Sequence, residues 1–363
     1  MRERIGRSAM VAVLLLLGVH ATARAQSPEL ALREFASGQI KKGVRSIGFG
    51  GDGATWGNYS LVWRDAGTAL VDAGATGYTN GNLFSFTTVG FTTPQLWRGL
   101  TIYAIALSQS ANTIHLALSS PGLGPVPIAV RGDGSNQALF IKLAMPLGHG
   151  FAIGVLLSYE VSQFDATTEE GAPAAVRFRT QWLPSGGLGV SWQPTPRWLA
   201  GVRVILNHDW ERRVDPTTSA SGLYRSYEFR AGASFSPWKG ALLDAGGTLL
   251  ERANAIAGTE TLGGGLNLGF EQAFLERQLV VRGGVDECTF GAWGRHGCTA
   301  GGGLSVKVHP VNLDVAYLYN LGAERVGPVF GSESHSILAT LTLDYLWIVK
   351  RALAAQAAKK AHE

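Results

Sequence analysis

Apolar and polar residues alternate along many segments of this chain. In residues 311–321 (VNLDVAYLYNL), the apolar and aromatic residues Val311, Leu313, Val315, Tyr317 and Tyr319 share one parity, and the polar residues Asn312, Asp314 and Asn320 share the other. Successive side chains of a strand point to opposite faces of a sheet, so this segment has one apolar and one polar face. Many such segments predict a membrane β-barrel with lipid outside and a polar interior.

The alternation also predicts how many strands the barrel contains. Strands are expected at 83–93, 100–110, 137–146, 151–164, 175–193, 198–213, 223–236, 241–254, 259–273, 278–288, 298–308, 311–321 and 335–347. Short connections, such as 147–150 and 237–240, alternate with long ones, such as 111–136 and 322–334, as in bacterial barrels with short periplasmic turns. This sorting requires one more strand before 83–93. Residues 60–76 are the candidate, which gives an antiparallel barrel of about 14 strands.

The first 25 residues are predicted to be a secretory signal peptide. Three arginines (Arg2, Arg4 and Arg7) precede the apolar residues 10–19, and Ala23-Arg24-Ala25 matches a cleavage site. An apolar stretch of about 10 residues is too short to cross a bilayer as a helix, which needs about 20 residues. Export and alternation together predict the outer membrane of a Gram-negative-type bacterium.

The composition favours membrane β-structure over a soluble enzyme. The chain has 48 glycines and only 16% charged residues, whereas average soluble domains have about 25%. Its formal net charge is +4, but the leader contains four arginines and one glutamate, which leaves 27 basic and 26 acidic residues in the mature chain. The charge therefore gives no reason to expect a nucleic-acid partner.

The chain has two cysteines, Cys288 and Cys298. An exported chain meets an oxidising compartment, so these residues are expected to form a disulfide that staples a loop. The loop closure would contribute about 2–3 kcal/mol. A metal site is the weaker alternative, because His296 has no further obvious ligands beside it. No metal and no cofactor are predicted.

Tryptophans and the C-terminal segment point to the periplasmic side. Tryptophan favours the membrane–water boundary, so residues near the predicted short turns and the end of the last strand are expected to form an aromatic girdle. These residues are Trp97, Trp192, Trp198, Trp238 and Trp347. Residues 348–363 are rich in alanine and basic residues and predict a short periplasmic helix. This tail is either without function or a contact for a periplasmic partner.

The face of the strands opposite to the lipid carries many charged residues. They either line a polar permeation path or pair across neighbouring strands, which contributes about 0.2–1 kcal/mol for each pair. The lumen-facing candidates are Arg177, Arg179, Arg203, Asp209, Glu228, Arg230, Asp244, Arg252, Glu271, Arg282, Asp286, Lys307, Asp314 and Asp344.

Residues 43–54 (GVRSIGFGGDGA) and 65–69 (DAGTA) resemble the start of FadL-type outer-membrane proteins, including the PorV-like branch. Those proteins open with G-x-R-x-x-G-x-G-G-A and a following D-x-A-s-A stretch. Asp52 stands where the family usually has alanine, and the N-P-A-G motif that usually follows is missing. The resemblance implies a barrel of about 14 strands with an N-terminal hatch that plugs its interior. The predicted organisation is a signal peptide (1–25), a hatch that could include the first strand (26–82), a barrel (83–347) and a periplasmic tail (348–363).

Function is predicted from the resemblance, because catalytic motifs are missing. The sequence has no G-x-S-x-G, no H-E-x-x-H and no phosphate-binding loop. FadL-type proteins take up hydrophobic compounds such as fatty acids or aromatic hydrocarbons, which implies passive uptake here, with outer-membrane lipid and a hydrophobic small molecule as partners. The PorV-like branch implies a structural or secretion-associated docking role instead. An outer-membrane hydrolase is a distant alternative, because His208-Asp209 and His335-Ser336 lack the other residues of such sites.

Overall fold

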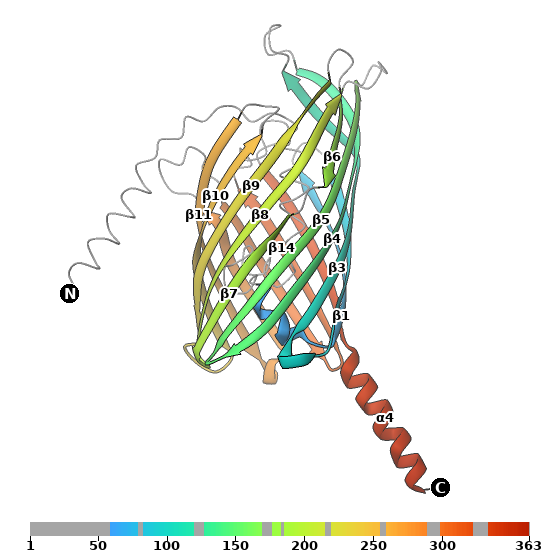
Figure 1. Ribbon diagram of the computed structural model, residues 1–363, viewed down its shortest axis with the longest axis vertical. Helices are drawn as coiled ribbons and strands as arrows, with labels where there is room; N and C mark the ends of the chain where they lie inside the picture. Colours follow the sequence, from blue (N-terminus) through green and yellow to red (C-terminus); the bar gives the residue numbers. More distant parts are fainter. Residues whose placement is uncertain are drawn as a thin grey trace, which may run out of the picture.

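Antiparallel strands form a closed barrel, and the strands are tilted relative to the long axis of the barrel (Figure 1). The computed structural model describes residues 59–78, 83–119, 127–168, 176–182, 185–214, 219–254, 259–288, 298–321 and 333–362. Its strands are β1 (Thr68–Tyr78), β2 (Leu83–Thr92), β3 (Thr101–Ser119), β4 (Pro127–Gly148), β5 (Phe151–Thr168), β6 (Val176–Trp182), β7 (Ser185–Thr195), β8 (Trp198–Val214), β9 (Ser219–Phe235), β10 (Ala241–Asn254), β11 (Thr259–Phe274), β12 (Leu279–Cys288), β13 (Cys298–Val308), β14 (Val311–Leu321) and β15 (Glu333–Asp344). The helices are η1 (Tyr59–Asp65), η2 (Trp97–Gly99), η3 (Leu275–Arg277) and α4 (Tyr345–His362).

The strands described occupy 14 positions in the wall, because β6 and β7 share one position. Both pair with β5 on one side and with β8 on the other. The pairing of β1 with β15 and of β4 with β5 closes the ring. The predicted antiparallel barrel of about 14 strands is confirmed.

The start of the barrel differs from the prediction. Residues 60–76 do not form one strand: Tyr59–Asp65 is a 3-10 helix, and the first wall strand is Thr68–Tyr78. Gly67 separates the two with a φ of 82°, a left-handed conformation that glycine adopts at low cost. The strand is hard to recognise because its outward face consists mostly of alanine and glycine and its inward face includes Gly74.

Two other boundaries differ as well. The long connection predicted at 111–136 is mostly strand, because β3 and β4 continue to pair as far as Ser119 and Pro127 beyond an irregularity between Ala111 and Ile114. The last strand ends at Asp344, and α4 begins at Tyr345 rather than at residue 348. The Asp344 carboxylate accepts a hydrogen bond of 3.0 Å from the backbone N–H of Trp347, which caps the helix.

The two faces of the wall have different chemistry. In β14, Leu313, Val315 and Tyr317 are 41–45% exposed, whereas Asp314, Ala316 and Leu318 are at most 8% exposed. The same contrast holds in β2, β5, β11 and β15, where outward leucine, valine and aromatic side chains are exposed and alternate with buried residues. Because the sheet is closed, the exposed apolar residues form a belt around the outside, as lipid requires.

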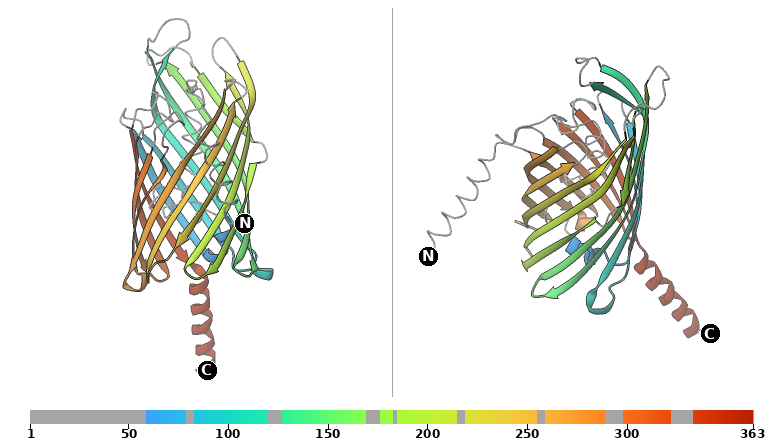
Figure 2. Two further views of the ribbon diagram at one scale, coloured as in Figure 1. Left: turned by 90° about the vertical axis from the view of Figure 1, so that its left-hand side faces the viewer. Right: turned by 45° about the horizontal axis from the view of Figure 1, so that its top comes forward.

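One rim of the barrel carries the short connections, and we call it the short-turn rim; α4 leaves the wall there and points away from it (Figures 1 and 2). Trp97 and Trp238 lie in these turns and are 72% and 57% exposed. Trp192 and Trp198 are also exposed, and their rings pack against Phe151 and Phe235. Trp347 lies in α4, with its ring 4.6 Å from that of His309. Among the described residues, no helix is long and apolar enough to cross a membrane.

The turn between β4 and β5 contains two glycines with a left-handed backbone, Gly148 (φ 91°) and Gly150 (φ 79°). We expect Gly148→Ala to lower the free energy of unfolding by about 1–2 kcal/mol through its φ alone, since no atom lies within 4 Å of the added Cβ. Gly150→Ala should cost about 1–3 kcal/mol more, because its Cβ would overlap the backbone carbonyl of Gln193. Urea unfolding in lipid vesicles measures both changes. Equal losses would show that this overlap relaxes.

Candidate functional site

The short helix η1 lies inside the barrel near the short-turn rim, against β4, β5 and β7 (Figures 1 and 2). Ser60 Oγ donates a buried hydrogen bond of 2.7 Å to Ser191 Oγ, and Arg64 Nη2 donates one of 2.6 Å to Gln193 Oε1. Leu61 and Val62 are buried in the same helix. The rest of the predicted hatch before η1, residues 26–58, lies outside the described residues, so the hatch stays a prediction.

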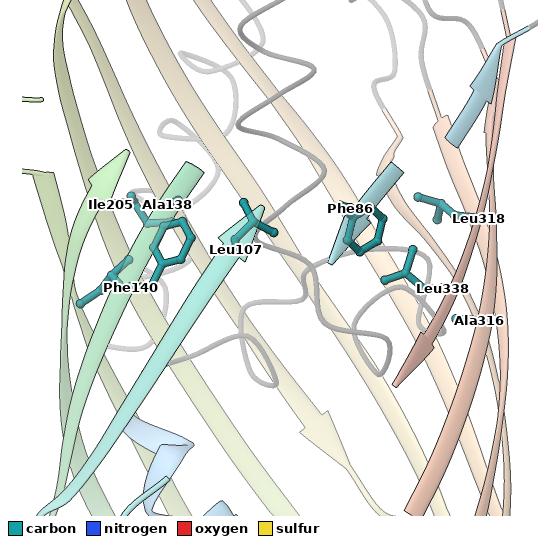
Figure 3. Packing of buried hydrophobic residues seen from close by; sticks show 9 residues of the cluster. Phe86, Leu107, Ala138, Phe140, Ile205, Ala316, Leu318 and Leu338 are labelled. Atoms are coloured by element: carbon teal, nitrogen blue, oxygen red, sulfur yellow. The ribbon is translucent and has the colours of Figure 1, made fainter. Parts of the chain in front are cut away.

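Inward-facing apolar residues form a cluster on the wall, which we call the apolar inner patch. Figure 3 shows its side chains in two groups, one from β3, β4 and β8 and one from β2, β14 and β15. Each residue is at most 8% exposed. The patch consists of Phe86, Leu107, Ala138, Phe140, Leu156, Ile205, Ala316, Leu318 and Leu338, with Ile105 packed against it.

A first group of charged residues joins four neighbouring strands, β11 to β14. Arg282 Nε lies 2.8 Å from Glu271 Oε2, and Arg282 Nη1 lies 3.1 Å from Asp314 Oδ1. Ser305 and Asn312 also donate hydrogen bonds to the Asp314 carboxylate. Glu271 is 1% exposed and Arg282 is 8% exposed, so the pair is buried. Removing one partner of such a pair leaves a buried charge without compensation.

A second group of charged residues lies on β8, β9 and β10. Glu228 Oε1 is 3.3 Å from Arg203 Nη2 and 2.7 Å from Arg230 Nε. The Asp244 carboxylate accepts hydrogen bonds of 2.5 Å from Ser234 Oγ and of 3.3 Å from Asn267 Nδ2. These contacts tie neighbouring strands together on the inner face.

The other residues singled out from the sequence fall in several places. Lys307 is exposed near the short-turn rim, and Asp344 caps α4. Cys298 is disulfide-bonded, and Cys288 is the only other cysteine of the sequence. Within the described ranges, no group of three or more histidine, cysteine, aspartate or glutamate side chains could hold a metal ion. Some candidates have side chains outside the described residues: Arg177, Arg179, Asp209, Arg252 and Asp286.

Sequence reasoning missed a row of buried polar side chains on the inner face. Each member lies beside the next in the strand register, from β2 through β1, β15 and β14 to β13. Asp72 is 8% exposed, and its Oδ1 has no hydrogen-bond partner in the part of the chain that the structure describes. The same is true of Thr340 Oγ1. The row, which we call the polar row, is Thr88, Asp72, Thr340, Asp314 and Ser305.

Comparison with known proteins shows a likeness in structure only. No family model and no curated protein matches the chain. A FadL homologue from Pseudomonas aeruginosa is 13% identical, with a TM-score of 0.51 over 80% of this chain and 94% of that one. The CymD monoaromatic hydrocarbon channel is 12% identical, with a TM-score of 0.52 over 83% of this chain and 96% of that one.

These comparisons confirm the predicted resemblance to FadL-type barrels at the level of the fold. A closed barrel leaves no unpaired backbone edge in the bilayer, and its apolar belt suits contact with lipid. The barrel therefore belongs in the outer membrane of a Gram-negative-type bacterium.

Proposed function

We propose that this barrel lets small hydrophobic compounds cross the outer membrane passively. The observation that carries the proposal is the apolar inner patch, which places Phe86, Phe140 and Leu107 on the inward face of the wall. Water-filled porins line their interior with polar groups, so inward aromatic and aliphatic side chains favour a different solute. One structural neighbour is a monoaromatic hydrocarbon channel by name, which supports the same class of compound.

The physical basis is differential solvation along the path. Contact with the patch removes apolar surface of the solute from water, which is favourable by about 25 cal/mol for each Å² buried. A modest gain suits passage, because a solute that binds tightly leaves slowly. The sequence has no nucleotide-binding loop, so the concentration gradient of the solute would provide the free energy for its passage.

Uptake by proteoliposomes tests the proposal. Vesicles with the full-length protein should accumulate a radiolabelled monoaromatic compound faster than empty vesicles. Phe140→Ser removes an inward ring from β4 and should slow this uptake by about 5–30-fold, since a loss of 1–2 kcal/mol corresponds to that factor. The matched control is Leu139→Ala, which changes the neighbouring outward residue, 43% exposed, and should leave uptake unchanged.

Two results would contradict the proposal: wild-type uptake no faster than that of empty vesicles, or equal slowing by the two variants.

The structural or docking role rests on the sequence pattern of residues 348–363 and on the resemblance to the PorV-like branch. Deleting that tail should then abolish partner capture and leave uptake intact. The hydrolase alternative has no further support among the described residues.

A further inference from the structure

The polar row lies directly beside the apolar inner patch. Two patch residues, Phe86 and Leu338, are each two positions from a threonine of the row on the same strand, and Leu107 is in register with Thr88. Residues two apart on one face of a strand are separated by about 6.6–6.8 Å. The ring of Phe86 lies over Gly74, the inward residue next to Asp72, where a Cβ would overlap it. An apolar surface and a carboxylate are therefore within reach of one small molecule.

The chemistry of the row favours a hydrogen-bond donor. Its side chains are two carboxylates and three hydroxyls. An ionised carboxylate accepts hydrogen bonds and donates none. Asp314 already accepts from Arg282, Ser305 and Asn312. The Thr340 and Thr88 hydroxyls lie close enough to act on the Asp72 carboxylate, but Asp72 Oδ1 and Thr340 Oγ1 are buried and no described residue makes a hydrogen bond of normal geometry to either atom. Buried polar atoms of this kind cost free energy until a partner meets them.

The charged side chains near Asp72 do not form a hydrogen bond with its Oδ1 atom. Asp314 and Lys142 are the charged side chains that act on Asp72 from a distance. Asp314 is paired with Arg282, and the Lys142 ammonium lies 5.2 Å from the centre of the Tyr103 ring. Neither donates a hydrogen bond to Asp72 Oδ1. Two carboxylates in one row also repel an anionic ligand.

Building on the proposed function, we propose that the polar row binds the donor group of an otherwise apolar compound, an amine or an alcohol. Asp72 Oδ1 accepts from that group, Thr340 Oγ contributes a second hydrogen bond, and the body of the compound lies against Phe86, Leu338 and Leu107. The site thus selects amphiphilic compounds with a donating head and rejects carboxylates of the same size.

Four compounds that share a phenyl ring test the selectivity: benzylamine, benzyl alcohol, toluene and benzoate. Binding to the full-length protein in lipid nanodiscs is measured by calorimetry, with empty nanodiscs as the baseline. Wild type should bind benzylamine at least about tenfold more tightly than benzoate, because hydrogen bonds to charged groups are the stronger class. Asp72→Asn should remove about tenfold of the benzylamine affinity and leave toluene unchanged. Thr340→Val should weaken benzyl alcohol by about 2–10-fold.

Asp244→Asn is the matched control. It makes the same change in another inward carboxylate, whose partners include Ser234 and Asn267, and should alter none of the four affinities. The inference is overturned if benzoate binds as well as benzylamine, or if the Asp72 and Asp244 variants behave alike. Loss of stability in Asp72→Asn without any change in selectivity would also overturn it, because Asp72 would then serve a partner within the chain.

Binding and uptake of the four compounds together distinguish the polar row as a binding site from passive uptake through the barrel. Toluene bound and taken up without any preference for a donor group refutes the polar row as a site and leaves passive uptake standing. No binding and no uptake of any of the four compounds refutes both.

Discussion

Replacing Arg282 by alanine is expected to destabilise the barrel by about 3–5 kcal/mol, the range for breaking a buried ion pair by removing one partner. Arg282 joins Glu271 on β11 to Asp314 on β14, at 2.8 and 3.1 Å. Without it, the buried Glu271 carboxylate loses its 2.8 Å ion pair, and the contact with Arg277, at 3.4 Å, involves a side chain that is largely in solvent. The free energy of unfolding, measured with urea in lipid vesicles, reports the loss.

The control for this prediction uses the same carboxylate. Arg277 also contacts Glu271, but its side chain is 68% exposed. Arg277→Ala should therefore cost about 0–1 kcal/mol, as exposed ion pairs do. Comparable losses in the two variants would contradict the view that burial makes the Arg282 network important. A Glu271→Gln change on top of Arg282→Ala should recover part of the loss, because it removes one of the uncompensated charges.

Leu268→Arg is expected to destabilise the barrel by about 2–4 kcal/mol, the cost of an arginine on the lipid face near the bilayer midplane. Leu268 lies on the outward face of β11 and is 58% exposed. It precedes the end of β11 at Phe274 by six residues. On a tilted strand this spans about 15 Å along the barrel axis, which is near the middle of an apolar band about 25 Å tall.

Leu275→Arg makes the same change at the short-turn rim. Leu275 opens η3 and is 70% exposed. An arginine there can reach the membrane–water boundary, so the expected cost is about 0–1 kcal/mol. Both variants are compared by the same urea unfolding measurement in vesicles. If the two substitutions cost the same, the exposed belt around β11 is not in contact with lipid.

The wall could be predicted from the sequence because one of its physical requirements is local. A strand between lipid and a polar interior must alternate, and 241–254, 298–308 and 311–321 were predicted with the bounds that the structure has. Residues 68–78 obey the same geometry, but small residues on both faces hide the alternation. Strand pairing beyond Ala111 was also missed, although Ile114, Leu116 and Leu118 alternate with more polar or smaller residues, because the irregularity between Ala111 and Ile114 interrupts the alternation.

The candidate site was less predictable, because it depends on register between strands. The odd or even position of a residue along a strand determines which face of the sheet it occupies. It does not determine which residues lie beside it on the neighbouring strands. Arg282 meets Asp314 although 32 residues separate them, and Asp72 meets Thr340 only because the first and last strands pair. The apolar inner patch shares a parity with the charged residues, so single inward residues such as Leu107 and Leu338 did not stand out.

The pairing of β1 with β15 also determines how assembly can finish. The other ladders join strands that are close in the sequence, whereas Thr76 and Ser336, 260 residues apart, share a hydrogen bond of 2.8 Å across this seam. The entropic cost of loop closure rises only logarithmically with sequence separation, but contacts of this separation form slowly. Until they form, the sheet is open and its two edges can pair with strands of other molecules. We therefore expect this seam to be the place where an unfinished molecule is most exposed to aggregation.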